Sequence, residues 1–224
     1  MDTMPQEITT INLTGVNCYL IKTGDGYILI DTGFSNKRTA LEKKLKDLGC
    51  LSGKLKLIIL THGDTDHAGN SAYLREKYGA KIAIHTADAE MVERGDMSVN
   101  RKTKPDKMSL IFKIISQIFP LFIKPGKFDV FSPDLTIDED FDLSIYGLNA
   151  RVIHLPGHSK GSIGVLTTEG NLFCGDLLYN MLGFNCIDDL SDYRSSIEKL
   201  KKLNVKMIFP GHGKPFSMDR FLRK

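Results

Sequence analysis

The sequence has no apolar run long enough to cross a membrane. A membrane-spanning helix needs about 18 or more consecutive apolar residues, and the nearest approach, residues 108–123, is interrupted by Lys113, Gln117 and Pro120. The first ten residues also lack the apolar stretch of a secretory signal. These two absences predict a cytoplasmic protein without a membrane span.

Closely spaced cysteines and an excess of charge are also missing. The four cysteines, Cys18, Cys50, Cys174 and Cys186, are far apart and form no C-x-x-C pair. We therefore expect reduced, partly buried thiols. A formal net charge of +3, with 25% charged residues, gives no broad basic surface of the kind that attracts nucleic acid. No nucleic-acid partner is expected.

What the sequence does contain is a succession of short apolar runs and helical patterns. With 224 residues, 42% of them hydrophobic, the chain can build one sizeable core, so we expect a single domain over residues 1–224.

Gly24 and Gly26 are expected to supply positive φ in a hairpin turn. The expected strands are 18–22, 27–31, 55–60, 81–85, 151–154, 162–167, 171–174 and 206–209. The expected helices are one that buries Leu41, Leu45 and Leu48 and ends at Gly49, one at 67–78, and one at 193–203. Two sheets between two helical layers is the simplest α/β architecture for this order.

The strongest local motif is T-H-G-D-T-D-H at residues 61–67, directly after a buried strand. Alternation along an extended strand end sends His62, Asp64 and Asp66 to the same side, while His67 begins the following helix. Imidazole and carboxylate groups are the ligands that zinc, iron or manganese take in proteins. The alternative is a polar loop in which Asp66 only caps that helix.

Three later segments place a ligand-type residue directly after a glycine at the end of an apolar strand. These residues are His158, Asp176 and His212. Glycine allows the backbone to turn tightly beside a site. The repetition favours a metal site over unrelated polar loops.

In this order, I-D-T-G at 30–33, the 61–67 motif, P-G-H-S at 156–159, G-D at 175–176 and P-G-H-G at 210–213 resemble the metallo-β-lactamase superfamily. The resemblance extends over about residues 16–213. It implies a four-layer αββα sandwich of two mixed β-sheets that holds two divalent metal ions, with zinc as the expected metal and iron or manganese as alternatives. It also implies a first position made by His62, Asp64 and His158, a second position made by Asp66, His67 and His212, a bridging Asp176, and a buried Asp31 behind the ligands.

One ligand departs from the family pattern. The family usually has histidine where this chain has Asp64, and the carboxylate is expected to add a negative charge and a preference for iron or manganese at the first position. Tyr179 stands where similar acyl-homoserine-lactone lactonases carry a tyrosine that contacts the substrate carbonyl, although a core or rim tyrosine is the alternative. His85 is expected to be structural or simply exposed. His154 is expected to be a structural histidine at a strand end, with a supporting hydrogen bond behind the ligand His158 as the alternative.

Residues 94–130 follow neither half of the pattern and are expected to be an insert that is basic at first and then apolar. If residues 108–119 form a helix, Pro120 should end or kink it. Three roles remain open for the helix: packing, a lid or homodimer contact near the metal site, and binding at a membrane surface.

The function implied by the resemblance is hydrolysis of an ester, thioester or lactone by a metal-bridging hydroxide. Asp66 would accept or relay the proton, and Asp31 would orient the ligand loop. The apolar insert favours a small-molecule substrate with an acyl chain. The alternatives are a non-haem iron oxygen- or sulfur-redox enzyme, because two histidines and a carboxylate are typical ligands of such iron, and a phosphodiesterase or nuclease. A binding protein with an inactive site is disfavoured, because every ligand position holds a residue able to bind metal.

Overall fold

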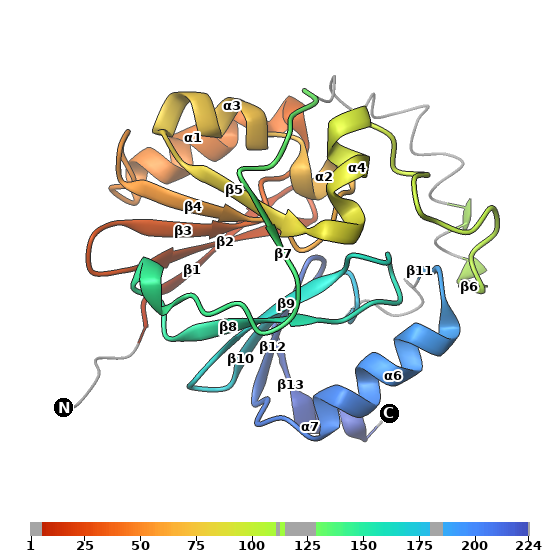
Figure 1. The fold of residues 1–224 in the computed structure, drawn as a ribbon. Coiled ribbons are helices and arrows are strands. Elements are labelled where there is room, and N and C mark those ends of the chain that lie inside the picture. Colours follow the sequence, from red (N-terminus) through yellow and green to blue (C-terminus); the bar gives the residue numbers. More distant parts are fainter. Residues whose placement is uncertain (1–5, 111–112, 115–128, 180–185, 224) are drawn as a thin grey trace.

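Two β-sheets face each other in the computed structural model, which describes residues 6–110, 113–114, 129–179 and 186–223 (Figure 1). In spatial order, the first sheet contains β1 (Ile8–Leu13), β2 (Val16–Lys22), β3 (Tyr27–Ile30), β4 (Leu55–Ile59), β5 (Lys81–His85) and β7 (Leu135–Ile137). The second contains β13 (Phe216–Ser217), β12 (Met207–Pro210), β10 (Asn171–Gly175), β9 (Ile163–Thr167) and β8 (Ala150–His154).

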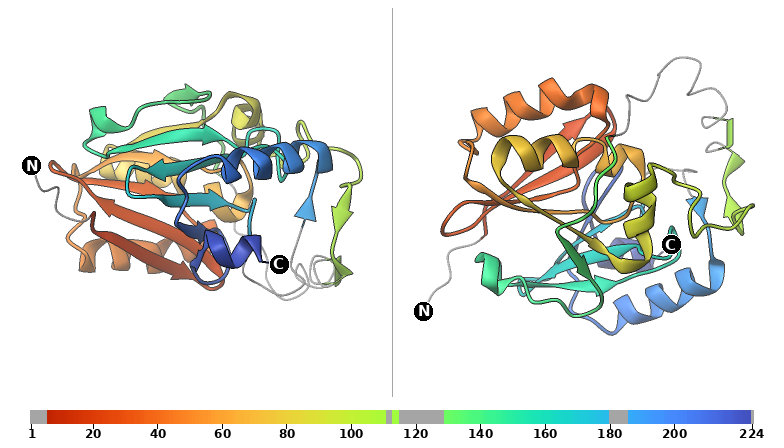
Figure 2. Two further views of the ribbon diagram at one scale, coloured as in Figure 1. Left: turned by 90° about the horizontal axis from the view of Figure 1, so that it is seen from below. Right: turned by 45° about the horizontal axis from the view of Figure 1, so that its top comes forward.

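Helices cover the outer face of each sheet. Figure 1 shows α1 (Arg38–Asp47) and α3 (Ser71–Tyr78) above the first sheet, and α6 (Leu190–Lys201) and α7 (Met218–Leu222) below the second. The other helical elements whose bounds lie within the described residues are α2 (Thr65–Ala68), α4 (Thr86–Arg94) and the 3₁₀ turns η1 (Ser35–Lys37) and η2 (Ser144–Tyr146). A separate antiparallel pair, β6 (Lys107–Met108) and β11 (Cys186–Ile187), lies outside both sheets (Figure 2).

Both sheets are mixed. In the first, β1, β2 and β3 pair antiparallel, whereas β3, β4, β5 and β7 pair parallel. In the second, β10 and β12 are parallel and the other pairs are antiparallel. The predicted four-layer αββα sandwich of two mixed sheets is confirmed.

Three apolar clusters hold these layers together. Tyr19, Ile59 and Phe173 belong to the cluster between the sheets, and each is at most 2% exposed. Leu41 belongs to the cluster beneath α1 and α3, and Leu200 to the cluster beneath α6 and α7. Because alternate residues of a strand point to opposite faces, the buried strands supply an inner and an outer core.

Two local predictions are wrong. Strands β2 and β3 form the expected hairpin, but neither Gly24 nor Gly26 is among the glycines with positive φ. Gly26 is needed for space, because a Cβ there would collide with the carbonyl oxygen of Lys54. The helix expected at 67–78 instead begins at Thr65 and is interrupted after Ala68, so Asp66 lies inside α2 and does not cap it.

The insert is described only in part. Met108 lies in β6, so a helix over 108–119 cannot begin there. Leu110, Lys113 and Ile114 are helical, while the remainder of that predicted helix and Pro120 lie outside the described residues. Its lid, dimer and membrane-surface roles stay predictions. No helix in the described part of the chain is long and apolar enough to span a membrane.

Candidate metal centre

The seven predicted ligands converge at one edge of the sandwich. His62 follows β4, Asp176 follows β10, and His212 follows β12. Helix α2 brings Asp66 and His67 to the same place, with Asp64 at its N-cap position. Among the described residues, three groups have ligand atoms within 4.8 Å of one another: His62, His67 and Asp176; His62, Asp64 and His158; and Asp66, His67 and His212.

Three buried atoms in this cluster are left without a hydrogen bond. They are Nε2 of His62, Nε2 of His67 and Oδ1 of Asp176, considering the described part of the chain. Burying a polar group without a partner costs about 1–3 kcal/mol, and more for a charged group. Two imidazoles and a carboxylate suit a divalent transition metal, which would supply the missing partner. The residues present therefore fit the metal site that the sequence predicts.

The other ring nitrogen of each histidine is held by a hydrogen bond, which leaves Nε2 directed at the cluster. The Nδ1 partners are Thr61 Oγ1 for His62 (3.0 Å), Asp31 Oδ2 for His67 (2.8 Å), the Cys186 carbonyl for His158 (3.1 Å) and the Gly15 carbonyl for His212 (2.9 Å). Such partners orient a metal-binding imidazole and fix its tautomer.

Asp31 connects two of the ligand segments from behind. Its carboxylate accepts hydrogen bonds from the amide and hydroxyl of Thr61 and from Nδ1 of His67, each at 2.8 Å. Its backbone has φ of 58°, a strained conformation for a residue with a Cβ. The surrounding hydrogen bonds maintain this conformation, which aims the carboxylate at both partners.

The loop that carries His212 is held by hydrogen bonds from β2, near the N-terminus. The side-chain amide of Asn17 donates to the carbonyls of Pro210 (3.0 Å) and Gly213 (2.7 Å), and its backbone amide donates to the carbonyl of Gly211 (2.8 Å). Gly211 must lack a side chain, because a Cβ there would lie 2.6 Å from Cε1 of His67. The glycines before the ligands thus permit close approach as well as tight turns.

The charges in the cluster balance one another. Burial alone would raise the pKa of Asp64 and Asp176, but Arg101 lowers the first and His212 and His67 lower the second, each to well below the usual range. Burial lowers the pKa of His212, whereas Asp176 and Asp66 raise it, for a net pKa of about 10. Burial also lowers the pKa of His67, but Asp66 and Asp176 raise it overall, so without a metal the protonated rings of His67 and His212 supply positive charge that bound cations would replace.

Two charged residues at this site, the partly buried Arg101 and the fully buried Asp88, were not predicted from the sequence. Nη2 of Arg101 lies 2.8 Å from Oδ1 of Asp64. The pKa of Asp64 lies well below its usual range, so the carboxylate carries the expected negative charge, and the ion pair with Arg101 offsets that charge. Asp88 accepts hydrogen bonds from the Gly63 amide (3.2 Å), the Ser159 hydroxyl (2.7 Å) and the Gly161 amide (2.7 Å). Neither residue belongs to a recognisable local motif.

Tyr179 lies against the cluster, and the two remaining histidines lie outside its ligand groups. The Tyr179 hydroxyl donates to Oδ2 of Asp176 at 2.9 Å, and its ring stacks on that of His212 with centroids 6.1 Å apart. His85 accepts a hydrogen bond from the Ala87 amide at the start of α4 and stacks on His154.

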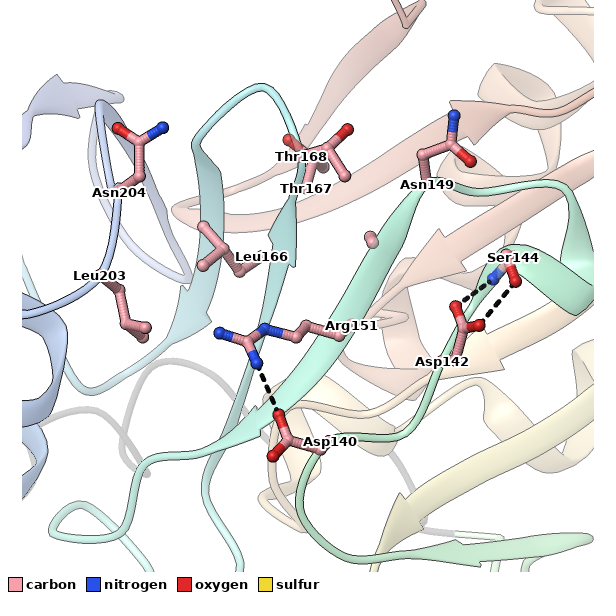
Figure 3. A pocket seen from close by; sticks show the side chains of 11 residues that line it. Asp140, Asp142, Ser144, Asn149, Arg151, Leu166, Thr167, Thr168, Leu203 and Asn204 are labelled. Atoms are coloured by element: carbon pink, nitrogen blue, oxygen red, sulfur yellow. Dashed lines mark hydrogen bonds and ion pairs between the residues drawn. The ribbon is translucent and has the colours of Figure 1, made fainter.

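Two surface cavities differ in their relation to the cluster. A cavity of about 540 Å³ includes Asp140, Arg151 and Leu166 in its lining but none of the predicted ligands (Figure 3). Another, of about 470 Å³, includes Arg101, Cys186 and Met97. The second cavity therefore adjoins the first metal position through Arg101 and Cys186.

Comparison with known proteins agrees with this geometry. The sequence matches the family profile described as "Metallo-beta-lactamase superfamily" over residues 11–212. The chain belongs to this superfamily. A solved structure, that of TTHA1623 in a di-iron-bound form, is 25% identical, with a TM-score of 0.65 and 97% of each chain covered.

Several curated relatives have related names. "Beta-lactamase-like protein 2 homolog" of Drosophila melanogaster is 29% identical over 205 residues, covering 92% of this chain and 61% of that protein. "Hydroxyacylglutathione hydrolase GloC" of Haemophilus influenzae is 29% identical over 216 residues, covering 92% of this chain and 90% of that protein. "Acyl-coenzyme A thioesterase MBLAC2" of Gallus gallus is 26% identical over 227 residues, covering 92% of this chain and 76% of that protein. The chain spans about three fifths of the length of the Drosophila protein.

Proposed function

We propose that this protein is a metal-dependent hydrolase that cleaves a thioester, ester or lactone of a small acyl compound, with thioesters favoured. The observation that carries the proposal is the convergence of three buried atoms without hydrogen bonds, Nε2 of His62, Nε2 of His67 and Oδ1 of Asp176. A cation bound among these atoms would supply the missing interactions, and would replace the ion pair in which His67 Nε2 lies 3.3 Å from Asp176 Oδ1.

The ligand groups divide between two positions. His62, Asp64 and His158 would hold the first ion, Asp66, His67 and His212 the second, and Asp176 would contact both. Divalent cations at such a site polarise a carbonyl group and lower the pKa of water towards neutrality. Nitrogen and carboxylate donors suit zinc, iron and manganese, so the metal must be identified by analysis.

The chain's own side chains complete the chemistry. Asp66 has a half-exposed carboxylate 3.3 Å from Nε2 of His212, where it can accept a proton released during hydrolysis. Asp31 holds the ring of His67 and so keeps Nε2 fixed during the reaction. The Tyr179 hydroxyl donates to Asp176, and it would have to turn its proton away from this carboxylate to meet a substrate oxygen.

Two relatives support the thioester preference. One is named an acyl-coenzyme A thioesterase and the other a hydroxyacylglutathione hydrolase, and both names describe release of an acyl group from a thiol carrier. Ester and lactone cleavage passes through the same type of oxyanion, so these substrates belong in the same test.

The deciding experiment combines metal analysis with a substrate panel. Protein purified without added metal is analysed for zinc, iron and manganese and assayed on matched thioester, ester, lactone and phosphodiester substrates, and for oxygen consumption. We expect up to two ions per chain and fastest turnover of thioesters, abolished by a chelator and restored by the metal. Metal-independent turnover, or activity only on phosphodiesters or oxygen, would contradict the proposal.

A further inference from the structure

An arginine from the segment after α4 reaches into the first metal position. Nη2 of Arg101 lies 2.8 Å from Oδ1 of Asp64, and the two side chains are 17% and 12% exposed. Nε of Arg101 is buried and has no hydrogen bond in the described part of the chain. The ion pair with Asp64 is therefore the contact that defines where this guanidinium lies.

The two oxygens of Asp64 have different surroundings. Oδ1 faces Arg101, while Oδ2 lies 3.1 Å from Nε2 of His158 and 3.5 Å from Nε2 of His62. Only Oδ2 is directed towards the two imidazoles, so Arg101 restricts Asp64 to one ligand oxygen. A guanidinium is a strong donor that remains protonated at any pH at which the protein folds.

Arg101 also makes the two metal positions unequal in charge. At the first position, the charge of Asp64 is offset by Arg101, and the two histidines are neutral when they bind metal. At the second position, Asp66 lies 3.5 Å from His67 and 3.3 Å from His212. No lysine or arginine forms an ion pair with Asp66 among the described residues, so the second position keeps its negative charge.

We propose that Arg101 is a positioning residue that weakens the first metal position, so that the second position fills before it. The guanidinium repels an incoming dication, and it withholds one oxygen of Asp64 from coordination. This inference rests on the proposed metal-dependent function. It adds an order of metal loading, which the ligand set alone does not specify.

The segment around Arg101 is anchored by other contacts, which makes substitution practicable. The backbone amide of Lys102 donates to both carboxylate oxygens of Asp188, at 3.1 and 3.3 Å. The Lys102 ammonium pairs with Asp106 at 2.7 Å and with Asp189 at 2.9 Å. Removing the Arg101 charge should therefore leave the segment in place.

The test is titration of the whole metal-free chain with Co²⁺ and with Zn²⁺. Calorimetry gives the two affinities, and the visible absorption of Co²⁺ reports the coordination of each position. The variants are Arg101→Met and Arg101→Gln, which remove the charge, and Arg101→Lys, which keeps it. Lys104→Met is the matched control, because it removes a charge from an exposed site in the same segment.

In the wild type we expect two binding steps whose affinities differ by at least about tenfold. Arg101→Met and Arg101→Gln should tighten the weaker step by at least about tenfold and change its Co²⁺ spectrum, whereas Arg101→Lys and Lys104→Met should resemble the wild type. If circular dichroism shows that one of the two neutral variants does not fold, the metal titration of the other variant decides the test.

Two results would overturn the role of Arg101 while leaving the proposed function intact. These are equal affinities for both ions in the wild type, and an unchanged or weaker second step in both neutral variants. Absence of any metal binding by the wild type would overturn the proposed function and this inference together.

Discussion

Replacement of Asp88 should weaken both the fold and the metal site, because this residue joins two ligand loops. Its Oδ1 accepts from the Gly161 amide, and its Oδ2 accepts from the Gly63 amide and the Ser159 hydroxyl. Gly63 lies between the proposed ligands His62 and Asp64, while Ser159 follows the proposed ligand His158. Asp88 is fully buried, so water cannot easily replace a lost acceptor.

The magnitude follows from the number of donors that lose their acceptor. Asp88→Asn retains one acceptor oxygen and turns its NH₂ group towards at least one donor. One buried donor without a partner costs about 1–3 kcal/mol, so we expect a loss of about 2 kcal/mol in the free energy of unfolding. Asp88→Ala leaves the Gly63 and Gly161 amides without their acceptor and should cost about 4 kcal/mol, because the Ser159 hydroxyl can still bond to Ser162 Oγ, 2.7 Å away. Gly161 packs directly on this carboxylate, since a Cβ there would lie 2.5 Å from Cγ of Asp88.

The assay is urea unfolding of the metal-free protein, followed by Zn²⁺ titration of the folded variants. Asp138→Asn is the control, because Asp138 also accepts a hydrogen bond near α4, from Thr86, but its side chain is 80% exposed. That control should change stability by less than about 0.5 kcal/mol. An Asp88→Asn protein with wild-type stability and metal affinity would refute the idea that Asp88 holds the ligand loops together.

Three further predictions concern the ligands themselves. His67→Ala should remove at least one bound ion and most of the activity. His154→Gln changes a histidine outside the ligand groups and should keep the metal content and the activity of the wild type. Elemental analysis and the thioester assay measure these two quantities. The metal-free protein should lose stability as pH rises, because Asp176 raises the pKa of His212 from 6.5 to about 10. Its contribution is complete below pH 6.5 and disappears as pH passes about 10, and thermal melts with chelator, compared with metal-loaded protein, test this window. Tyr179→Phe should lower kcat by about tenfold or more with unchanged metal content if its hydroxyl meets a substrate oxygen, and equal turnover by both proteins would refute that role.

The ligand positions were predictable because each combines a local strand signal with a residue able to bind metal. His158, Asp176 and His212 follow apolar strands, and each is preceded by a glycine. Periodicity also identified β4, β5 and the strands of the second sheet from β8 to β12. The structure brings these predicted residues into one cluster, although their role as ligands remains a proposal.

The contacts that complete the cluster were not predictable from local pattern. Arg101 is 37 residues from its partner Asp64, in a segment that the sequence identified only as the basic part of an insert. Asp88 lies in a helix whose sequence gives no sign that its carboxylate turns inward towards amides 25 and 73 residues away. Strand β1 was also missed, since its buried residues only partly alternate with exposed ones. Such features depend on contacts between residues that are far apart in the sequence, and the periodicity of a single sequence does not reveal these contacts.

The attachment of the His212 loop to the N-terminal strands has a consequence for folding order. The hydrogen bond from His212 to Gly15 joins residues 197 positions apart, and those from Asn17 to Pro210 and Gly213 span 193 and 196 positions. Contacts between residues so far apart in the sequence form late in folding. The chain between them must be ordered before the contact can offset the entropy cost of closing so long a loop. During synthesis the second metal position can therefore be completed only after β12 has left the ribosome. Early metal capture by the emerging 61–67 segment would have to rely on an incomplete ligand set.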